Sequence, residues 1–172
     1  MTEPINNRNI IDISPLPTPK QMQSVLPLPE KTRQMVLQAR QAIRDILHGR
    51  DSNRLLIIIG PCSIHDPEAA ILYAERLKQV ADRIGEHAFI VLRTYFEKPR
   101  TTVGWKGLIN DPHLDGSCDI GGGFELARSI LLNINNLGMP CATEFLDPVT
   151  PQYISDLISW AAIGARTTES QT

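Results

Sequence analysis

The chain has 172 residues, of which 42% are hydrophobic and 21% are charged, and its formal net charge is −2. This composition is typical of a globular protein with a sizeable core, and no apolar run approaches the roughly 20 residues that span a bilayer. The acidic balance, without a lysine-rich stripe, argues against nucleic acid as a partner, while three scattered cysteines and no signal-peptide pattern favour a reduced, cytoplasmic protein.

The first half of the chain predicts two helices and two strands. Residues 1–28 are rich in Asn and Pro and are expected to form an extension that packs on something other than the core, such as another subunit. A stripe of apolar residues predicts a helix over Glu30 to Leu47. The run from Leu55 to Ile59, followed by Gly60, is typical of a parallel strand that is covered on both faces.

Asp66 and Pro67 form an N-cap and a first helical residue, so a second long helix is expected to reach about Ile84. A strand is predicted over Ala88–Leu92. The long loop that follows, from about residue 96 to 122, is of a length that is usually functional in compact domains.

The second half repeats the alternation of helix and strand. A helix is expected over Phe124–Leu137, a strand over Cys141–Leu146, a helix that Thr150 caps, and a strand over Ala161–Ala165. Regular alternation predicts an α/β fold with a parallel sheet and right-handed crossovers. No helix follows the fourth strand, so the chain is expected to be the first half of a (β/α)8 barrel, which needs about 250 residues when complete. The expected division is an N-terminal extension over 1–28 and a half-barrel over 29–172.

Three cations lie within eight residues, at and after the end of the second strand: Arg93, Lys98 and Arg100. Arginine binds carboxylate or phosphate through two parallel hydrogen bonds, and lysine acts as a point charge, so a small anion with several charges is the natural ligand. The alternative is a solvated loop whose cations pair with neighbours such as Glu97.

Other strands also end in residues that are capable of chemistry. Cys62 follows the first strand and could be an inert thiol or a metal ligand. Glu144 in the third strand could neutralise a cation or take part in proton transfer. Arg166 ends the apolar fourth strand, where a guanidinium group requires an anion or an acidic partner.

Three segments together carry a resemblance to a known family: Gly60–Pro67, Arg93–Pro112 and Ile163–Gln171. They resemble 3-deoxy-D-arabino-heptulosonate 7-phosphate (DAHP) synthase, in its microbial, feedback-regulated type I form, and the likeness covers nearly the whole chain. It implies a (β/α)8 barrel that condenses phosphoenolpyruvate with erythrose 4-phosphate and releases phosphate, the first step of the shikimate pathway to chorismate and the aromatic amino acids.

The resemblance also implies a role for each matching residue. A divalent metal such as Mn, Fe or Co would polarise the aldehyde, with Cys62 as one ligand. Glu144 would lie beside phosphoenolpyruvate and position a water, and Lys98 would shape the junction between the two substrates. The anion-binding residues would be Arg93, Lys98 and Arg166 for phosphoenolpyruvate, and Arg100 and Thr101 for the phosphate of the aldose.

The same family is inhibited by aromatic amino acids, which bind a pocket that includes the segment Asp147–Tyr153; the expected effector-binding residues are Asp147, Pro151 and Gln152. The segment leans weakly toward the tyrosine-sensitive branch. A homo-oligomer is expected of the full-length protein.

The family's other metal ligands lie in the second half of the barrel, so the 172-residue chain alone is expected to lack substantial activity. Two alternatives remain at this point. One is a catalytically incomplete fragment that binds an aromatic amino acid or full-length subunits. The other is a related sugar-acid phosphate synthase that uses a different aldose.

Overall fold

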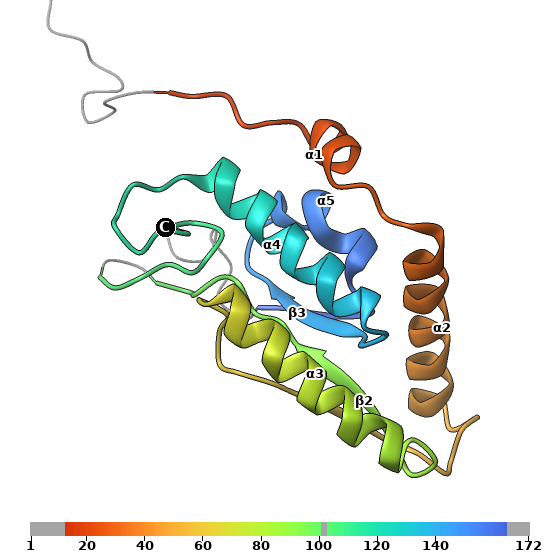
Figure 1. Ribbon diagram of the computed structural model, residues 1–172. Coiled ribbons are helices and arrows are strands. Elements are labelled where there is room, and N and C mark those ends of the chain that lie inside the picture. The colour runs from red at the N-terminus through yellow and green to blue at the C-terminus, as the bar shows by residue number, and fades with distance from the viewer. Residues whose placement is uncertain (1–12, 101–102, 165–172) are drawn as a thin grey trace, which may run out of the picture.

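A computed structural model describes residues 13–100 and 103–164. Four parallel strands form one curled sheet in the order β1-β2-β3-β4, and each strand is joined to the next by a helical crossover (Figure 1). This arrangement confirms the predicted α/β half-barrel.

The strands are β1 (Leu55–Ile59), β2 (Ala88–Arg93), β3 (Cys141–Phe145) and β4 (Trp160–Ile163). The helices are α1 (Pro19–Val25), α2 (Glu30–Leu47), α3 (Pro67–Ile84), α4 (Ile120–Asn136) and α5 (Thr150–Ile154), with a short 3-10 turn, η1 (Ser155–Leu157). The predicted bounds of α2 and α3 are therefore confirmed, and every predicted strand exists within two residues of its expected limits.

Alternate residues of each strand face opposite sides of the sheet. On one side, Ile90 and Leu92 of β2 and Cys141 of β3 join a large core with the inner faces of α3 and α4. On the other side, Val91 and Ala142 pack with Ile43 of α2. Both faces are covered where the strands begin, which explains the continuous apolar runs.

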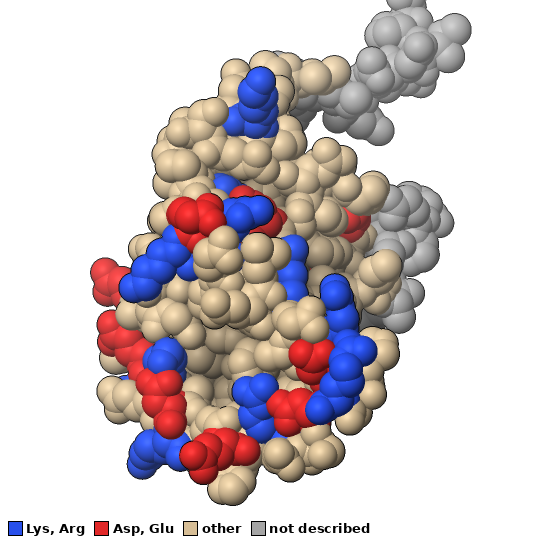
Figure 2. Space-filling view, turned by 90° about the vertical axis from the view of Figure 1, so that its right-hand side faces the viewer, with Lys and Arg blue, Asp and Glu red and all other residues tan. Residues whose placement is uncertain are grey.

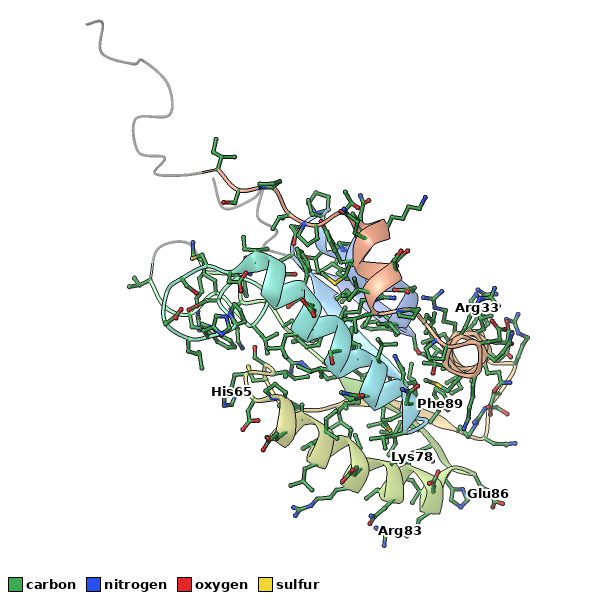
Figure 3. The ribbon with its side chains drawn as sticks, turned by 45° about the horizontal axis from the view of Figure 1, so that its top comes forward. Arg33, His65, Lys78, Arg83, Glu86 and Phe89 are labelled. Atoms are coloured by element: carbon green, nitrogen blue, oxygen red, sulfur yellow. The ribbon has the colours of Figure 1, made fainter. Side chains whose placement is uncertain are left out.

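The side that α2 covers also carries Arg93 and Glu144, because they follow Val91 and Ala142 by two residues in their strands. These two polar side chains lie toward the ends of β2 and β3, beyond the residues that pack on α2. Figure 3 shows the two ends of α3, with His65 at the end where β1 finishes and Arg83 and Glu86 at the opposite end. The candidate site therefore lies at the His65 end of the sheet.

The N-terminal segment contributes to the core of this chain. Thr18 and Gln21 form a capping box that begins α1. Met22 is only 4% exposed, and Leu26 and Leu28 pack against the same core. The expectation that residues 1–28 lie apart from the core is wrong for this part, whereas Ile10 and Ile11 lie outside the described residues.

The helix after β3 differs from its prediction in two ways. Thr150 does not cap it; instead the Asp147 carboxylate accepts hydrogen bonds from the backbone N–H groups of Val149 and Thr150 and from the Thr150 hydroxyl. The helix also ends at Ile154 and continues as η1.

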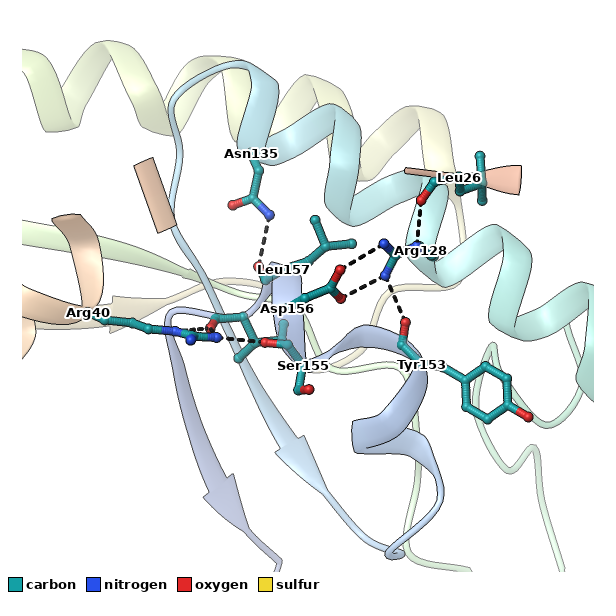
Figure 4. A network of polar contacts seen from close by, with 9 residues as sticks. Leu26, Arg40, Arg128, Asn135, Tyr153, Ser155, Asp156 and Leu157 are labelled. Atoms are coloured by element: carbon teal, nitrogen blue, oxygen red, sulfur yellow. Dashed lines mark hydrogen bonds and ion pairs between the residues drawn. The ribbon is translucent and has the colours of Figure 1, made fainter. Parts of the chain in front are cut away.

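The Arg128 side chain of α4 joins this region to the N-terminal segment (Figure 4). It is buried, makes two hydrogen bonds to the Asp156 carboxylate and donates to the carbonyl oxygens of Leu26 and Tyr153. Beside it, Arg40 of α2 donates to the carbonyl oxygens of Ser155 and Ile158. Carbonyl groups at the end of a short helix are thus satisfied by two arginines.

The surface over α2 carries both signs of charge side by side (Figure 2). Several of these charges belong to local pairs, such as Arg50 with Asp45 and Arg33 with Glu30. In the part of the chain that the structure describes, no helix is long and apolar enough to cross a membrane.

Candidate active site

The ends of β1 and β2 lie unusually close together at Gly60. A Cβ atom there would lie 2.6 Å from the carbonyl oxygen of Arg93, so only glycine allows this approach. The chain that follows Gly60 therefore runs across the end of β2, and it carries Cys62 to the Arg93 side chain.

Cys62, Arg93 and Lys98 form the centre of the site. The Lys98 Nζ atom lies 2.9 Å from the Cys62 Sγ atom, and the Arg93 Nη2 atom donates to the Cys62 carbonyl oxygen at 3.3 Å. The hydrogen bond and the charge of Lys98 lower the pKa of the exposed Cys62 thiol, with smaller contributions from Arg93 and Arg100. The prediction that thiol and cations gather at one rim is confirmed, and the exposed Cys62 is not a packed thiol.

Arg93 is aligned for a ligand that carries negative charge. Its guanidinium group lies over the Tyr95 ring, 4.0 Å from the ring centre, and its buried Nε atom has no hydrogen-bond partner within the described residues. Within the same residues, no carboxylate forms an ion pair with Arg93, Lys98 or Arg100. Three neighbouring cations that no carboxylate of residues 13–100 and 103–164 neutralises are the kind of cluster to which anions bind.

The loop that carries Lys98 folds back on itself. The backbone N–H of Lys98 donates to the carbonyl oxygen of Lys106, and Glu97 pairs with Gly107 as an isolated antiparallel bridge. Gly107 has a φ of +107° and lies against the backbone of Phe96 and Glu97. This pairing fixes the direction in which the Lys98 side chain leaves the loop.

Trp105 anchors the middle of the same loop. It is half-buried, and its Nε1 atom donates to the carbonyl oxygen of Asp111 at 2.8 Å. Its ring meets that of His65 edge to face, with 6.5 Å between the ring centres. The loop after β2 is therefore attached to the loop after β1 that carries Cys62.

Glu144 lies near the end of β3, beside the end of β4. A Cβ atom at Gly164 would come within 3.2 Å of the Glu144 Oε1 atom, so this carboxylate lies against the end of β4. Burial, and then the negative charge of Glu144, raise the pKa of Tyr95.

Side-chain hydrogen bonds extend the pairing of β2 and β3 past the ladder. The Thr94 hydroxyl donates to the carbonyl oxygen of Ala142, and the Thr143 hydroxyl donates to that of Thr94. These bonds fix the positions of Arg93 and Glu144 relative to each other.

Beneath the loop that carries Lys98, a cavity of about 330 Å³ separates that loop from the segment after β3. Asp147 lines this cavity, whereas Pro151 and Gln152 are not among its lining residues. The three expected effector-binding residues therefore do not share this space.

Glu97 is the residue of this region that the sequence does not reveal. The solvated-loop hypothesis expects it to pair with the neighbouring cations, but the side chain turns inward and lines the cavity opposite Asp147. Burial, and then the charge of Asp147, raise the pKa of Glu97 from 4.5 to about 8. Contacts between residues that lie fifty positions apart leave no local signal in a sequence.

The described residues do not fit a complete metal site. They contain no group of three or more His, Cys, Asp or Glu side chains that could hold a metal ion. The Cys62 sulfur faces an ammonium group instead of further ligands. Two other predicted residues, Thr101 and Arg166, lie outside the described residues.

Comparison with known proteins gives a consistent result. A family model described as the DAHP synthetase I family matches residues 25–172. The chain is 55% identical over 168 residues to the Tyr-sensitive phospho-2-dehydro-3-deoxyheptonate aldolase of Escherichia coli K12, covering 98% of this chain and 47% of the relative. It is 56% identical over 162 residues to the Phe-sensitive enzyme of the same organism, covering 94% of this chain and 46% of the relative.

A solved structure shares the fold. The phospho-2-dehydro-3-deoxyheptonate aldolase from Francisella tularensis SCHU S4 superposes with a TM-score of 0.89 at 50% identity, over 95% of this chain and 48% of that chain. The chain thus spans about half the length of these three relatives.

Proposed function

Because this chain belongs to the DAHP synthetase I family, we propose that it forms the N-terminal part of a 3-deoxy-7-phosphoheptulonate synthase. This transferase condenses phosphoenolpyruvate with erythrose 4-phosphate, and it supplies the pathway to chorismate and the aromatic amino acids. The observation that carries the proposal is the cluster of Arg93, Lys98 and Arg100 around Cys62, which has no protein carboxylate partner within the described residues.

The proposed roles follow from where the charges lie. Arg93 and Lys98 bind the phosphate and carboxylate of phosphoenolpyruvate, and the Tyr95 ring beneath Arg93 keeps its guanidinium plane oriented. Arg100 extends the same positive charge along the loop toward the second substrate. Arg166 and Thr101 complete the two anion sites in this proposal.

The reaction joins the methylene carbon of phosphoenolpyruvate to the aldehyde carbon of erythrose 4-phosphate. The carbon that bears the phosphate then becomes cationic, water adds to it, and phosphate leaves with the original bridging oxygen. In this proposal Glu144, at the end of the neighbouring strand, orients that water and accepts its proton. The cations reduce the repulsion between two anionic substrates, so positioning and electrostatic stabilisation supply much of the rate.

The proposal includes a divalent metal, and Cys62 is the one metal ligand that it assigns to this chain. The 172-residue chain by itself is expected to show no substantial turnover, because its described residues do not complete such a site. Rapid, metal-dependent turnover by the isolated chain would contradict this expectation.

Regulation and location complete the proposal. Two similar enzymes are named Tyr-sensitive and Phe-sensitive, which supports an aromatic amino acid as an inhibitor of this protein. Asp147, Pro151 and Gln152 remain the proposed effector-binding residues, and a homo-oligomer remains the proposed assembly. The free Cys62 thiol beside Lys98 suits a reducing, cytoplasmic location.

A chimeric enzyme tests the proposed function. This chain would replace the matching half of the Tyr-sensitive Escherichia coli relative, and consumption of phosphoenolpyruvate would be followed with erythrose 4-phosphate and with arabinose 5-phosphate. We expect turnover with the erythrose compound, a loss of at least about a hundredfold in Arg93→Ala, and no loss in the control Arg83→Ala at the opposite end of α3.

Each other outcome contradicts the proposal in a recognisable way. A preference for arabinose 5-phosphate would favour a related sugar-acid phosphate synthase. Binding of tyrosine or phenylalanine without any binding of phosphoenolpyruvate would favour a fragment without catalytic function.

A further inference from the structure

The cavity beneath the loop brings two carboxyl groups together from separate elements. Glu97 belongs to the loop after β2, and Asp147 belongs to the segment after β3. Half of the residues that line the cavity are apolar: Leu16, Pro99, Ile109, Ile120, Phe124, Leu146 and Val149. The other polar or charged residues of its walls are Lys98, Arg100, Lys106, Asn110 and Thr150.

The two carboxyl groups differ in what surrounds them. Both oxygens of Asp147 accept hydrogen bonds: Oδ1 from the N–H groups of Val149 and Thr150, at 2.6 and 2.9 Å, and Oδ2 from the Thr150 hydroxyl, at 2.7 Å. The Glu97 Oε2 atom is buried and has no donor within the described residues. Asp147 is therefore the carboxylate of the pair, and a proton on Glu97 would supply the missing hydrogen bond.

The pKa values agree with this geometry. Burial, followed by the charge of Asp147 and a hydrogen bond to it, raises the pKa of Glu97 to about 8. Burial opposes ionisation of Asp147 too, but the hydrogen bonds from Thr150 outweigh it and the pKa of Asp147 is lowered. Two acids in contact thus separate into a donor and an acceptor.

We propose that Glu97 is a positioning residue: its protonated carboxyl group donates to Asp147 and so holds the loop that carries Lys98 and Arg100 against the segment after β3. Loss of that proton places two negative charges face to face across the cavity and releases the loop. Lys98 follows Glu97 directly in the chain, so any movement of Glu97 moves a substrate-binding cation.

Other polar and charged groups line the same cavity as Glu97. The polar side chains of Thr150 and Asn110 lower the pKa of Glu97 and so reduce the effect of burial without cancelling it. No ion pair to Glu97 forms within the described part of the chain. The cations that line the same cavity are Lys98, Arg100 and Lys106.

The first experiment uses the 172-residue chain and its own fluorescence. Trp105 lies in the loop, so the variant Trp160→Phe leaves one tryptophan that reports loop position from pH 6 to 10. We expect a transition near pH 8 that Glu97→Gln removes, because a glutamine amide donates to Asp147 at every pH. We expect Asp147→Asn to move the transition to lower pH, because the asparagine amide donates to an ionised Glu97.

Controls separate this titration from others. The edge-to-face contact of His65 with the Trp105 ring is present in every variant, so its effect on the fluorescence is common to all the curves. Glu125→Gln, an exposed change on α4, should leave the transition in place. If the Trp105 fluorescence of Glu97→Gln changes with pH as it does in the parent, the proposal is overturned. A Glu97→Ala variant can be added, and should it fail to fold, the result for Glu97→Gln still decides.

The consequence for substrate affinity rests on the proposed function, and binding of phosphoenolpyruvate to the same chain by calorimetry tests it. Between pH 7 and 9 we expect affinity to fall by about tenfold in the parent but by less than about twofold in Glu97→Gln. Equal losses in both would overturn the role of Glu97 in positioning. A normal Trp105 transition without phosphoenolpyruvate binding at any pH would support the proton-dependent contact and count against the proposed function.

Discussion

A thiol and an ammonium group in contact change each other's chemistry. The hydrogen bond and the charge of Lys98 lower the pKa of the Cys62 thiol, and the contact with the Cys62 sulfur in turn fixes the end of a long, flexible lysine side chain. Cys141, buried in β3, shows the opposite behaviour, because burial raises the pKa of its thiol. The pKa values of these two thiols therefore shift in opposite directions from that of an ordinary cysteine.

Alkylation of Cys62 measures this coupling. In a Cys118→Ser background, we expect iodoacetamide to modify Cys62 rapidly at pH 7 and to leave the buried Cys141 unmodified. Lys98→Met should slow the reaction at pH 7 by about tenfold and raise the pH of half-maximal rate. The matched control is Lys106→Met, and an equal rate in Lys98→Met and the parent would contradict the assigned contact.

The buried Glu97 carboxyl group predicts a pH-dependent stability. Its pKa in the folded chain, about 8, lies above the ordinary 4.5, so the folded state binds the proton more tightly. The stabilisation is fully present below about pH 4.5 and is lost as the pH rises through 8. Between pH 5 and pH 8.5, the free energy of unfolding in urea should fall in the parent by on the order of 3 kcal/mol more than in Glu97→Gln. If the free energies of unfolding of the two proteins changed equally with pH, this would contradict the burial of the Glu97 carboxyl group.

At the scale of single residues, the sequence predicts the cluster but not the carboxyl pair. Cys62, Arg93 and Lys98 each follow the end of a parallel strand, and neighbouring parallel strands end at the same edge. Glu97 also follows a strand, but its inward direction depends on the bridge to Gly107 and on the position of Asp147. Neither contact has a local pattern.

At the scale of elements, hydrophobic periodicity predicts α2 and α3 well, because both are long and carry a continuous apolar stripe. It misses α1, which has seven residues, and it predicts that α5 exists but not that this helix ends after five residues. Elements this short depend on caps and tertiary contacts. For α1 the Thr18 and Gln21 capping box is the signal that the sequence does contain.

Arg128 holds three such elements together, and its removal should be costly. Arg128→Met would leave the Asp156 carboxylate without its partner and two carbonyl groups without donors, so we expect a loss of roughly 3 to 5 kcal/mol in urea unfolding. The double variant Arg128→Met with Asp156→Leu should recover part of that loss. If the free energy of unfolding of the single variant fell by less than about 1 kcal/mol, the network would contribute little to stability.

The cap of α3 offers a smaller, local test. The Asp66 carboxylate accepts from the N–H groups of Glu68 and Ala69 at 2.9 and 3.1 Å. Asp66→Ala should lower the free energy of unfolding by about 1 kcal/mol, while Asp66→Asn should lower it far less. Equal unfolding midpoints for alanine and asparagine would contradict the cap.

At the scale of the whole molecule, the described sheet has two strands, β1 and β4, that each pair on one side only. Both expose apolar side chains: Leu55 is 67% exposed and Ile163 is 83% exposed. Unpaired edges of this kind associate with other strands. The isolated chain should therefore form concentration-dependent oligomers, measured by light scattering after size exclusion.

Ile163→Lys should shift this association toward the monomer, because a charged residue at the edge of β4 opposes pairing. Leu72→Lys, an equal change of an exposed leucine on α3, is the matched control. If the parent remained strictly monomeric at high concentration, these strand edges would not mediate association.

The threonine hydroxyls that join the ends of β2 and β3 have a consequence for evolution. Because Thr94 and Thr143 fasten the two strands past the end of their ladder, Arg93 and Glu144 keep one separation whatever happens in the neighbouring loops. Mutations can then lengthen or reshape the neighbouring loops, while the positions of Arg93 and Glu144 at the strand ends stay unchanged. A sheet of this kind allows specificity to differ between related proteins while the residues at the strand ends keep their geometry.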